Sequence, residues 1–155
     1  MAYSNDEAHL VVKGMQPAQL LAALESVLLV VAGGFGLFRI GTGVDFDQVS
    51  IFGLTLNPLQ SQIFLVAGML GMAASLASAT ARTFGWLLFL GGGLLFAWGL
   101  MLNGLVAANP LSRLGDPLGL TVQDGWWHLV IAVSGLVIAV IPAHKAVRWT
   151  QPVAY

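Results

Sequence analysis

The sequence predicts an all-α fold, a four-helix transmembrane bundle, and three observations lead to it. Hydrophobic residues make up 57% of the 155 residues, whereas charged residues make up 8%, and the mean hydropathy is +0.85. Soluble domains carry about 25% charged residues, so this chain lacks the polar surface that water requires. Four of its segments contain roughly 20 apolar residues each, which is the length that crosses a bilayer core.

The predicted spans cover residues 17–38, 59–80, 83–107 and 125–144. Together they form one membrane domain, residues 17–144, with a cytoplasmic tail at each end, residues 1–16 and 145–155. None of the four segments has a polar face, which argues against four buried helices of a soluble protein.

Local signals mark where the first two helices begin. Pro17 suits the first turn of a helix because a helix leaves its first amide hydrogens unbonded. Before the second span, Asn57 offers a side chain that caps a helix, and Pro58 follows it at the first helical position. We therefore expect helices to begin at these two prolines.

The lengths of the connections determine how the spans are joined. Only Ala81 and Arg82 separate the second span from the third, so these two helices are expected to form an antiparallel hairpin. The connections at 39–57 and 108–124 are long enough to hold short interfacial helices, and Asn109-Pro110 is typical of the start of one. The bundle is thus expected to consist of two antiparallel hairpins.

The distribution of Lys and Arg predicts the orientation, because excess positive charge stays on the cytoplasmic side. One side of the membrane holds four basic residues and the other holds two: Lys13, Arg82, Lys145 and Arg148 against Arg39 and Arg113. Both termini are therefore expected in the cytoplasm, and the protein in a bacterial cytoplasmic (inner) membrane.

Small residues recur every four positions in the second and fourth spans. In lipid, helices associate where small side chains let the backbones approach, so these residues are expected to form packing surfaces. They are Ala67, Gly71, Ser75 and Ala79 in the second span, and Gly135 and Ala139 in the fourth. A shift of 64 residues aligns the two sets and places Phe64 opposite His128, which is consistent with an internal duplication.

Glu25 is the only charged residue well inside a predicted span. An ionised carboxylate at that depth costs up to a few kcal/mol, so it requires an explanation. A proton relay, a cation site and ligation of a chlorophyll magnesium are the functional explanations; a carboxyl bonded to neighbouring side chains is the structural one. We expect Glu25 to face the bundle interior or a partner subunit, near Ser75 or Ser78, and not lipid.

His128 opens the fourth span and is expected at the same height as Asn103, Gln60 and Gln62. This outer polar layer suits either a haem or chlorin, or a ring of hydrogen bonds between helices. A single hydrogen-bonded packing histidine is the structural explanation. His128 and Glu25 are predicted in opposite leaflets and are not expected to act as a pair.

Several function classes are excluded by composition. A net charge of −1 argues against nucleic acid as a partner, and the absence of cysteine removes thiol chemistry. No nucleophile elbow, phosphate loop or carboxylate pair is present, so the sequence predicts neither a catalytic residue nor a metal site, and no enzyme.

Two motifs carry a resemblance to a known family: an Ala-Arg turn before Phe84-Gly85-Trp86, and the opening of the last helix, Asp124-Gly125-Trp126-Trp127-His128-Leu129. Over residues 20–143 the chain resembles an uncharacterised family of small four-helix membrane proteins of actinobacterial type. That family often repeats His-Leu at its second helix, where this chain has Phe64-Leu65. It has no established activity to transfer.

A second resemblance is to subunit XI of the photosystem I reaction centre, on Leu24-Glu25 and on Asp124-Gly125-Trp126. In that three-span family a glutamate and histidines ligate chlorophyll. The resemblance implies pigment ligation at Glu25 and His128, with chlorophyll or haem as the cofactor, although the sequence itself requires none.

The sequence thus favours a non-enzymatic integral membrane protein that serves as an accessory or stabilising subunit of a larger membrane complex. Its expected partners are membrane lipid and other membrane subunits. A pigment- or haem-binding subunit of a photosynthetic or respiratory complex is one alternative, marked by Glu25 or His128. A small transporter or channel is the other, marked by Glu25.

Overall fold

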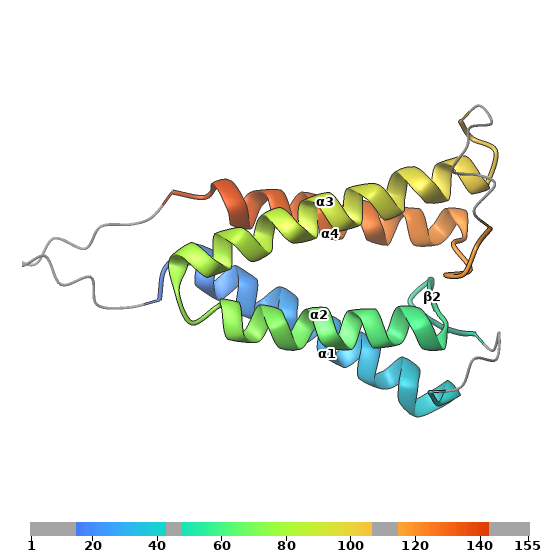
Figure 1. The fold of residues 1–155 in the computed structure, drawn as a ribbon, viewed down its shortest axis with the longest axis horizontal. Helices are drawn as coiled ribbons and strands as arrows, with labels where there is room; N and C mark the ends of the chain where they lie inside the picture. The colour runs from blue at the N-terminus through green and yellow to red at the C-terminus, as the bar shows by residue number, and fades with distance from the viewer. Residues whose placement is uncertain (1–14, 43–47, 107–114, 143–155) are drawn as a thin grey trace, which may run out of the picture.

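The computed structural model describes residues 15–42, 48–106 and 115–142. These residues form four helices and one small sheet: α1 (Pro17–Ile40), β1 (Val49–Ile51), β2 (Leu54–Leu56), α2 (Pro58–Ala74), α3 (Ser78–Leu102) and α4 (Val122–Val140). The helices alternate in direction along the long axis of the molecule (Figure 1). Helices α1, α3 and α4 are long and apolar enough to cross a membrane, and α2 has 17 residues, about 26 Å.

Helix α2 ends at Ala74, before the expected Thr80, and α3 begins at Ser78, before the expected Thr83. The reason is local. The Ser75 hydroxyl donates to the Met72 carbonyl over 2.7 Å, and such a side-chain bond competes with the bonds that continue a helix. Residues 75–77 are therefore the connection, and the expected turn at residues 81–82 lies within α3.

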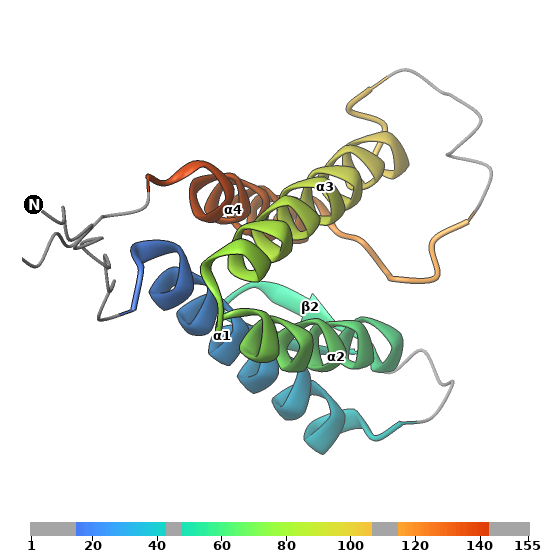
Figure 2. The ribbon, with the colours of Figure 1, turned by 60° about the vertical axis from the view of Figure 1, so that its left-hand side comes forward.

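The helices pack as two close pairs, α1 with α2 and α3 with α4, which both views of the ribbon show (Figures 1 and 2). Helices α2 and α3 are antiparallel, as their short connection predicts, but they touch at few positions. Contacts between the pairs are sparse, so the molecule is two helix pairs and not an evenly packed bundle.

Glycines bring the backbones of each pair together. A Cβ atom on Gly33 of α1 would lie 2.5 Å from the Ser61 carbonyl oxygen of α2. In the other pair, a Cβ on Gly92 of α3 would lie 2.8 Å from the His128 carbonyl oxygen of α4. Any side chain larger than hydrogen at these positions would push the two helices apart. Small residues at interfaces between membrane helices allow this close approach of the backbones.

Three of the predicted packing residues contact a neighbouring helix. Gly71 lies against Ser26 of α1 and Phe84 of α3, and Gly135 lies against the backbone of α3. Ala139 is buried beside Gly85, whose added Cβ would be 2.7 Å from the Ala139 nitrogen.

The rest of the second-span stripe is divided between α2, the connection and α3, and Ala67 packs against the core. Ala67 is half-buried, Ser75 follows the last residue of α2, and Ala79 is exposed in the first turn of α3. The early end of α2 is the reason, because it moves Ala79 onto another helix with a different rotation.

A β-hairpin, and not a helix, follows α1 in the described part of the connection. Its strands pair Val49 with Leu56 and Ile51 with Leu54. Phe52 and Gly53 form the turn with positive φ angles of 49° and 82°, the geometry that suits two-residue hairpins. The second connection is described only from Gly115, so the residues where a helix was expected to begin, 109–110, lie outside the described part.

Candidate functional site

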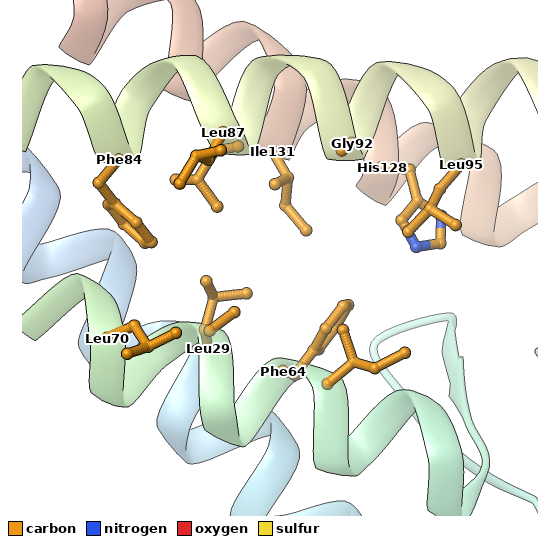
Figure 3. Close-up of a pocket in the computed structure, with 13 residues that line it drawn as sticks. Leu29, Phe64, Leu70, Phe84, Leu87, Gly92, Leu95, His128 and Ile131 are labelled. Carbon is orange, nitrogen blue, oxygen red and sulfur yellow. The ribbon is translucent and has the colours of Figure 1, made fainter.

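A cavity of about 210 Å³ lies between the two helix pairs. All four helices contribute to it, and all its lining side chains are apolar except one, the imidazole of His128 (Figure 3). The lining residues are Leu29, Ile63, Phe64, Ala67, Leu70, Phe84, Leu87, Leu88, Gly91, Gly92, Leu95, His128 and Ile131.

The cavity opens sideways between α2 and α3. Leu29 of α1 and His128 of α4 are buried, whereas Leu70 of α2 and Leu87 of α3 are 65% and 63% exposed. Because α2 and α3 do not pack closely, these exposed residues border an opening. In a bilayer the exposed surface of apolar helices faces acyl chains, so the mouth opens to lipid and not to water.

His128 is the polar group of the cavity. Its side chain is 1% exposed, and in Figure 3 the ring points from α4 into the space between the pairs, beside Leu95. Neither ring nitrogen has a hydrogen-bond partner of good geometry, and the nearest polar group is the Asp124 backbone one turn earlier, which interacts with the imidazole. The Phe64 ring meets the imidazole edge-on, with centroids 6.3 Å apart. Buried polar groups are rarely left without partners, which makes this imidazole a feature that needs explaining.

Asp124 lies one turn before His128 on α4 and is fully buried. Its Oδ1 accepts a hydrogen bond from the Thr55 amide of β2 over 2.6 Å. Its Oδ2 accepts from the Thr121 amide and hydroxyl, over 2.8 Å and 2.7 Å. The carboxylate therefore joins the hairpin to the first turn of α4, where the helix dipole also favours negative charge.

Three more hydrogen bonds hold the segments at this end together. Trp127 donates to the Phe52 carbonyl over 3.2 Å, and Asn57 donates to the Pro117 carbonyl over 3.0 Å. Asn103, predicted to share a layer with His128, donates to the Leu120 carbonyl over 3.1 Å. The hairpin and residues 115–121 thus form a cap over this end of the helices.

The two glutamines that we expected beside His128 lie differently. Gln60 is 1% exposed and both its amide atoms lack a partner, whereas Gln62 is exposed. Neither lines the cavity. The expected ring of hydrogen bonds between helices at this height is therefore replaced by contacts of the cap.

At the opposite end, Gln19 braces the molecule, a role that sequence reasoning missed. Its amide donates to the carbonyls of Ser75 and Leu76, over 3.0 Å and 2.9 Å, and so ties α1 to the connection between α2 and α3. Arg82 donates to the Ile141 carbonyl over 2.6 Å and ties α3 to the end of α4. No pattern in the sequence points to Gln19, since its partners are backbone atoms more than fifty residues away.

Glu25 lies outside the cavity. Its half-buried side chain interacts with the Ser134 hydroxyl of α4, and not with Ser75 or Ser78 as expected. The difference arises because α1 also contacts α4, across the two pairs, while the Ser75 hydroxyl is bonded within its own turn. Ser134 and His128 are six residues apart on α4, about 9 Å, so the structure does not bring Glu25 and His128 together.

In the described ranges, no three side chains of His, Cys, Asp or Glu lie close enough to hold a metal ion. The acidic group nearest in sequence to His128, Asp124, already accepts three hydrogen bonds. The cavity is therefore an apolar compartment with one imidazole.

Comparison with known proteins identifies a family. Residues 19–141 match the family described as a domain of unknown function, DUF4383, and the chain belongs to this family. The expected resemblance to an uncharacterised family is thereby confirmed, while the match gives no support to the actinobacterial or photosystem I likeness. No curated protein and no solved structure matches the chain.

Proposed function

We propose that this member of the family is a non-enzymatic accessory subunit of the membrane that binds a lipophilic molecule between its two helix pairs. The observation that carries the proposal is the buried His128 imidazole, which points into an apolar cavity that opens to lipid. Small-molecule sites are typically apolar, with a few polar groups that orient the ligand. Other membrane subunits are the partners that an accessory role implies.

Binding is favoured over catalysis by what the other polar side chains do. Asp124 holds the cap, Gln19 and Arg82 brace the opposite end, and Asn103 donates to backbone carbonyls. A catalytic site needs a second group positioned beside the first, such as a base beside a nucleophile. The cavity offers a single imidazole with apolar neighbours, which suits recognition.

The two alternatives from the sequence receive less support. Sites for drug-sized ligands measure roughly 300–1,000 Å³, so a tetrapyrrole would require the helix pairs to move apart from a cavity of about 210 Å³. A transporter or channel was suggested by Glu25, which interacts with Ser134 outside the cavity.

The proposal is tested by extracting what the protein holds. After purification in mild detergent, organic extraction and mass spectrometry are expected to recover a lipophilic molecule in near-stoichiometric amount. Gly91→Leu is expected to abolish this recovery, because Gly91 lines the cavity and a side chain there would fill its mouth. Gly93→Leu is the matched control: it lies on the same helix, has open space beside it and does not line the cavity.

Two results would contradict the proposal. One is a purified protein that yields no lipophilic molecule above the level found in a blank membrane extract. The other is equal recovery from the Gly91→Leu and Gly93→Leu variants, which would place the molecule on the outer surface.

Native mass spectrometry of the same samples tests the accessory role, for which we expect additional membrane subunits to co-purify.

Both termini are proposed to lie in the cytoplasm of a bacterium, on the basis of the charge asymmetry. Since the chain has no cysteine, single substitutions report the orientation directly. Ser50→Cys, on the exposed hairpin, should react with a membrane-impermeant maleimide in intact cells. Ala77→Cys, exposed at the opposite end before α3, should react only after permeabilisation. The reverse pattern would invert the orientation.

A further inference from the structure

The cavity is a slot that runs along the helices, with its polar group at one end. Leu95 and His128 lie at one end, and Phe84 and Leu70 at the other (Figure 3). Leu95 and Phe84 are eleven residues apart on α3, which corresponds to about 16 Å along the helix. The end under the cap carries the imidazole, whereas the opposite end is entirely apolar. A ligand that matches this slot has a small polar head and an apolar tail.

The volume limits the head to a single ring. An engineered apolar cavity of about 150 Å³ holds one benzene molecule, and this cavity measures about 210 Å³. It therefore accommodates one six-membered ring with small substituents, and the remainder of a longer molecule must leave through the mouth. The mouth lies between α2 and α3, where an apolar tail would continue among acyl chains.

The surroundings of His128 limit the charge of the head. A neutral imidazole has one donor and one acceptor nitrogen. Neither has a hydrogen-bond partner of good geometry here, although the Asp124 backbone lies beside the ring, so at least one nitrogen is available to a ligand. The lining contains no charged side chain, so a charged head would be buried without compensation. The matching group is an uncharged ring oxygen, either a carbonyl that accepts from the imidazole or a hydroxyl that donates to it.

We propose that the cavity binds a single-ring lipid of the quinone class, with a ring oxygen hydrogen-bonded to His128 and the tail leaving between α2 and α3. This rests on the proposed function, since it names the lipophilic molecule that the subunit holds. The Phe64 and His128 rings favour a flat head over a simple alcohol: their planes differ by 69° and form an aromatic corner. A planar ring meets such a corner in the edge-to-face geometry that aromatic groups prefer. The inference concerns binding and includes no redox step.

Decylubiquinone, a quinone ring on a ten-carbon chain, is a suitable probe because quinones quench tryptophan fluorescence. The full-length protein in detergent, with its bound lipid removed, is expected to show saturable quenching. n-Decanol shares the chain and offers one hydroxyl without a ring, and it is expected to compete at least about tenfold more weakly. His128→Phe keeps an aromatic ring without nitrogens and should weaken quinone binding by roughly tenfold, the effect of one lost hydrogen bond.

Two further variants separate the role of the imidazole from a change in folding. His128→Gln keeps a donor and an acceptor and should retain more affinity than His128→Phe. Gly93→Leu, outside the cavity, should bind like the unmodified protein, while thermal unfolding verifies that all variants fold.

The outcomes distinguish this inference from the proposed function. If n-decanol competes as well as the quinone, or if His128→Phe binds the quinone unchanged, the quinone assignment is overturned. A lipophilic molecule of another class recovered by extraction would then still support the proposed function. If no quinone binds and extraction recovers nothing, both are wrong.

Discussion

Adding one methyl group at Gly92 is expected to destabilise the protein, whereas the same addition at Gly93 is expected to stabilise it. A Cβ atom on Gly92 would lie 2.8 Å from the His128 oxygen and 2.9 Å from the Ala132 nitrogen. Both are backbone atoms of α4, which cannot rotate away as a side chain can. On Gly93 the Cβ would meet nothing within 4 Å.

The difference between the two variants is expected to be about 1–3 kcal/mol, and at the upper end of this range because the clash is with backbone atoms. Alanine is favoured over glycine inside a helix by about 1 kcal/mol, which both variants gain. Overpacking typically costs 1–3 kcal/mol and occasionally more, and only Gly92→Ala incurs it. Reversible unfolding in mixed micelles, followed by circular dichroism, measures both. Equal stability of the two variants would show that α3 and α4 are not in backbone contact at this position.

Replacing Asp124 with asparagine is expected to lower the free energy of unfolding by about 2–4 kcal/mol. The carboxylate accepts hydrogen bonds on both oxygens, from Thr55 on one and Thr121 on the other. An asparagine offers one oxygen and turns an amide group toward the remaining donor. A buried donor left without a partner costs about 1–3 kcal/mol, and the lost negative charge at the helix N-terminus adds to this.

Asp116→Asn is the matched control for this change. Asp116 is exposed and accepts one bond, from the Leu120 amide to Oδ1, which an asparagine oxygen can also accept. Its effect should stay within about 0.5 kcal/mol. Hydrogen exchange adds a local measurement, since the Thr55 amide should exchange faster in Asp124→Asn. Unchanged protection of Thr55 would mean that the carboxylate does not join the hairpin to α4.

Some elements of the fold follow from local sequence and were predicted from it. Helices α1 and α2 begin at Pro17 and Pro58, and the Asn57 side chain accepts from the Gln60 amide over 2.7 Å, as expected of a cap. The β-hairpin was missed although its signal is also local: apolar residues alternate in Val49–Ile51 and Leu54–Leu56 around Phe52-Gly53. Alternation of this kind predicts paired strands.

The site depended on features that are not local. His128 was singled out as a polar residue at a span end, but its orientation into a cavity depends on the loose contact between α2 and α3. That looseness follows from the pairing of α1 with α2 and of α3 with α4. Likewise, the interaction of Glu25 with Ser134 requires α1 to lie against α4, which no spacing in the sequence indicates.

By itself, the sequence determined that the chain has long apolar helices suited to lipid, where two of them begin, and which glycines are available for close packing. The tertiary structure decided which helices pair, where the cavity lies and which polar side chains reach it. The physical reason is that lipid accepts every face of an apolar helix, so hydrophobic periodicity does not mark the inner face. The pairing is decided instead by the fit of Gly33, Gly92 and Gly135 to the backbone of a particular neighbour, a match that exists only in three dimensions.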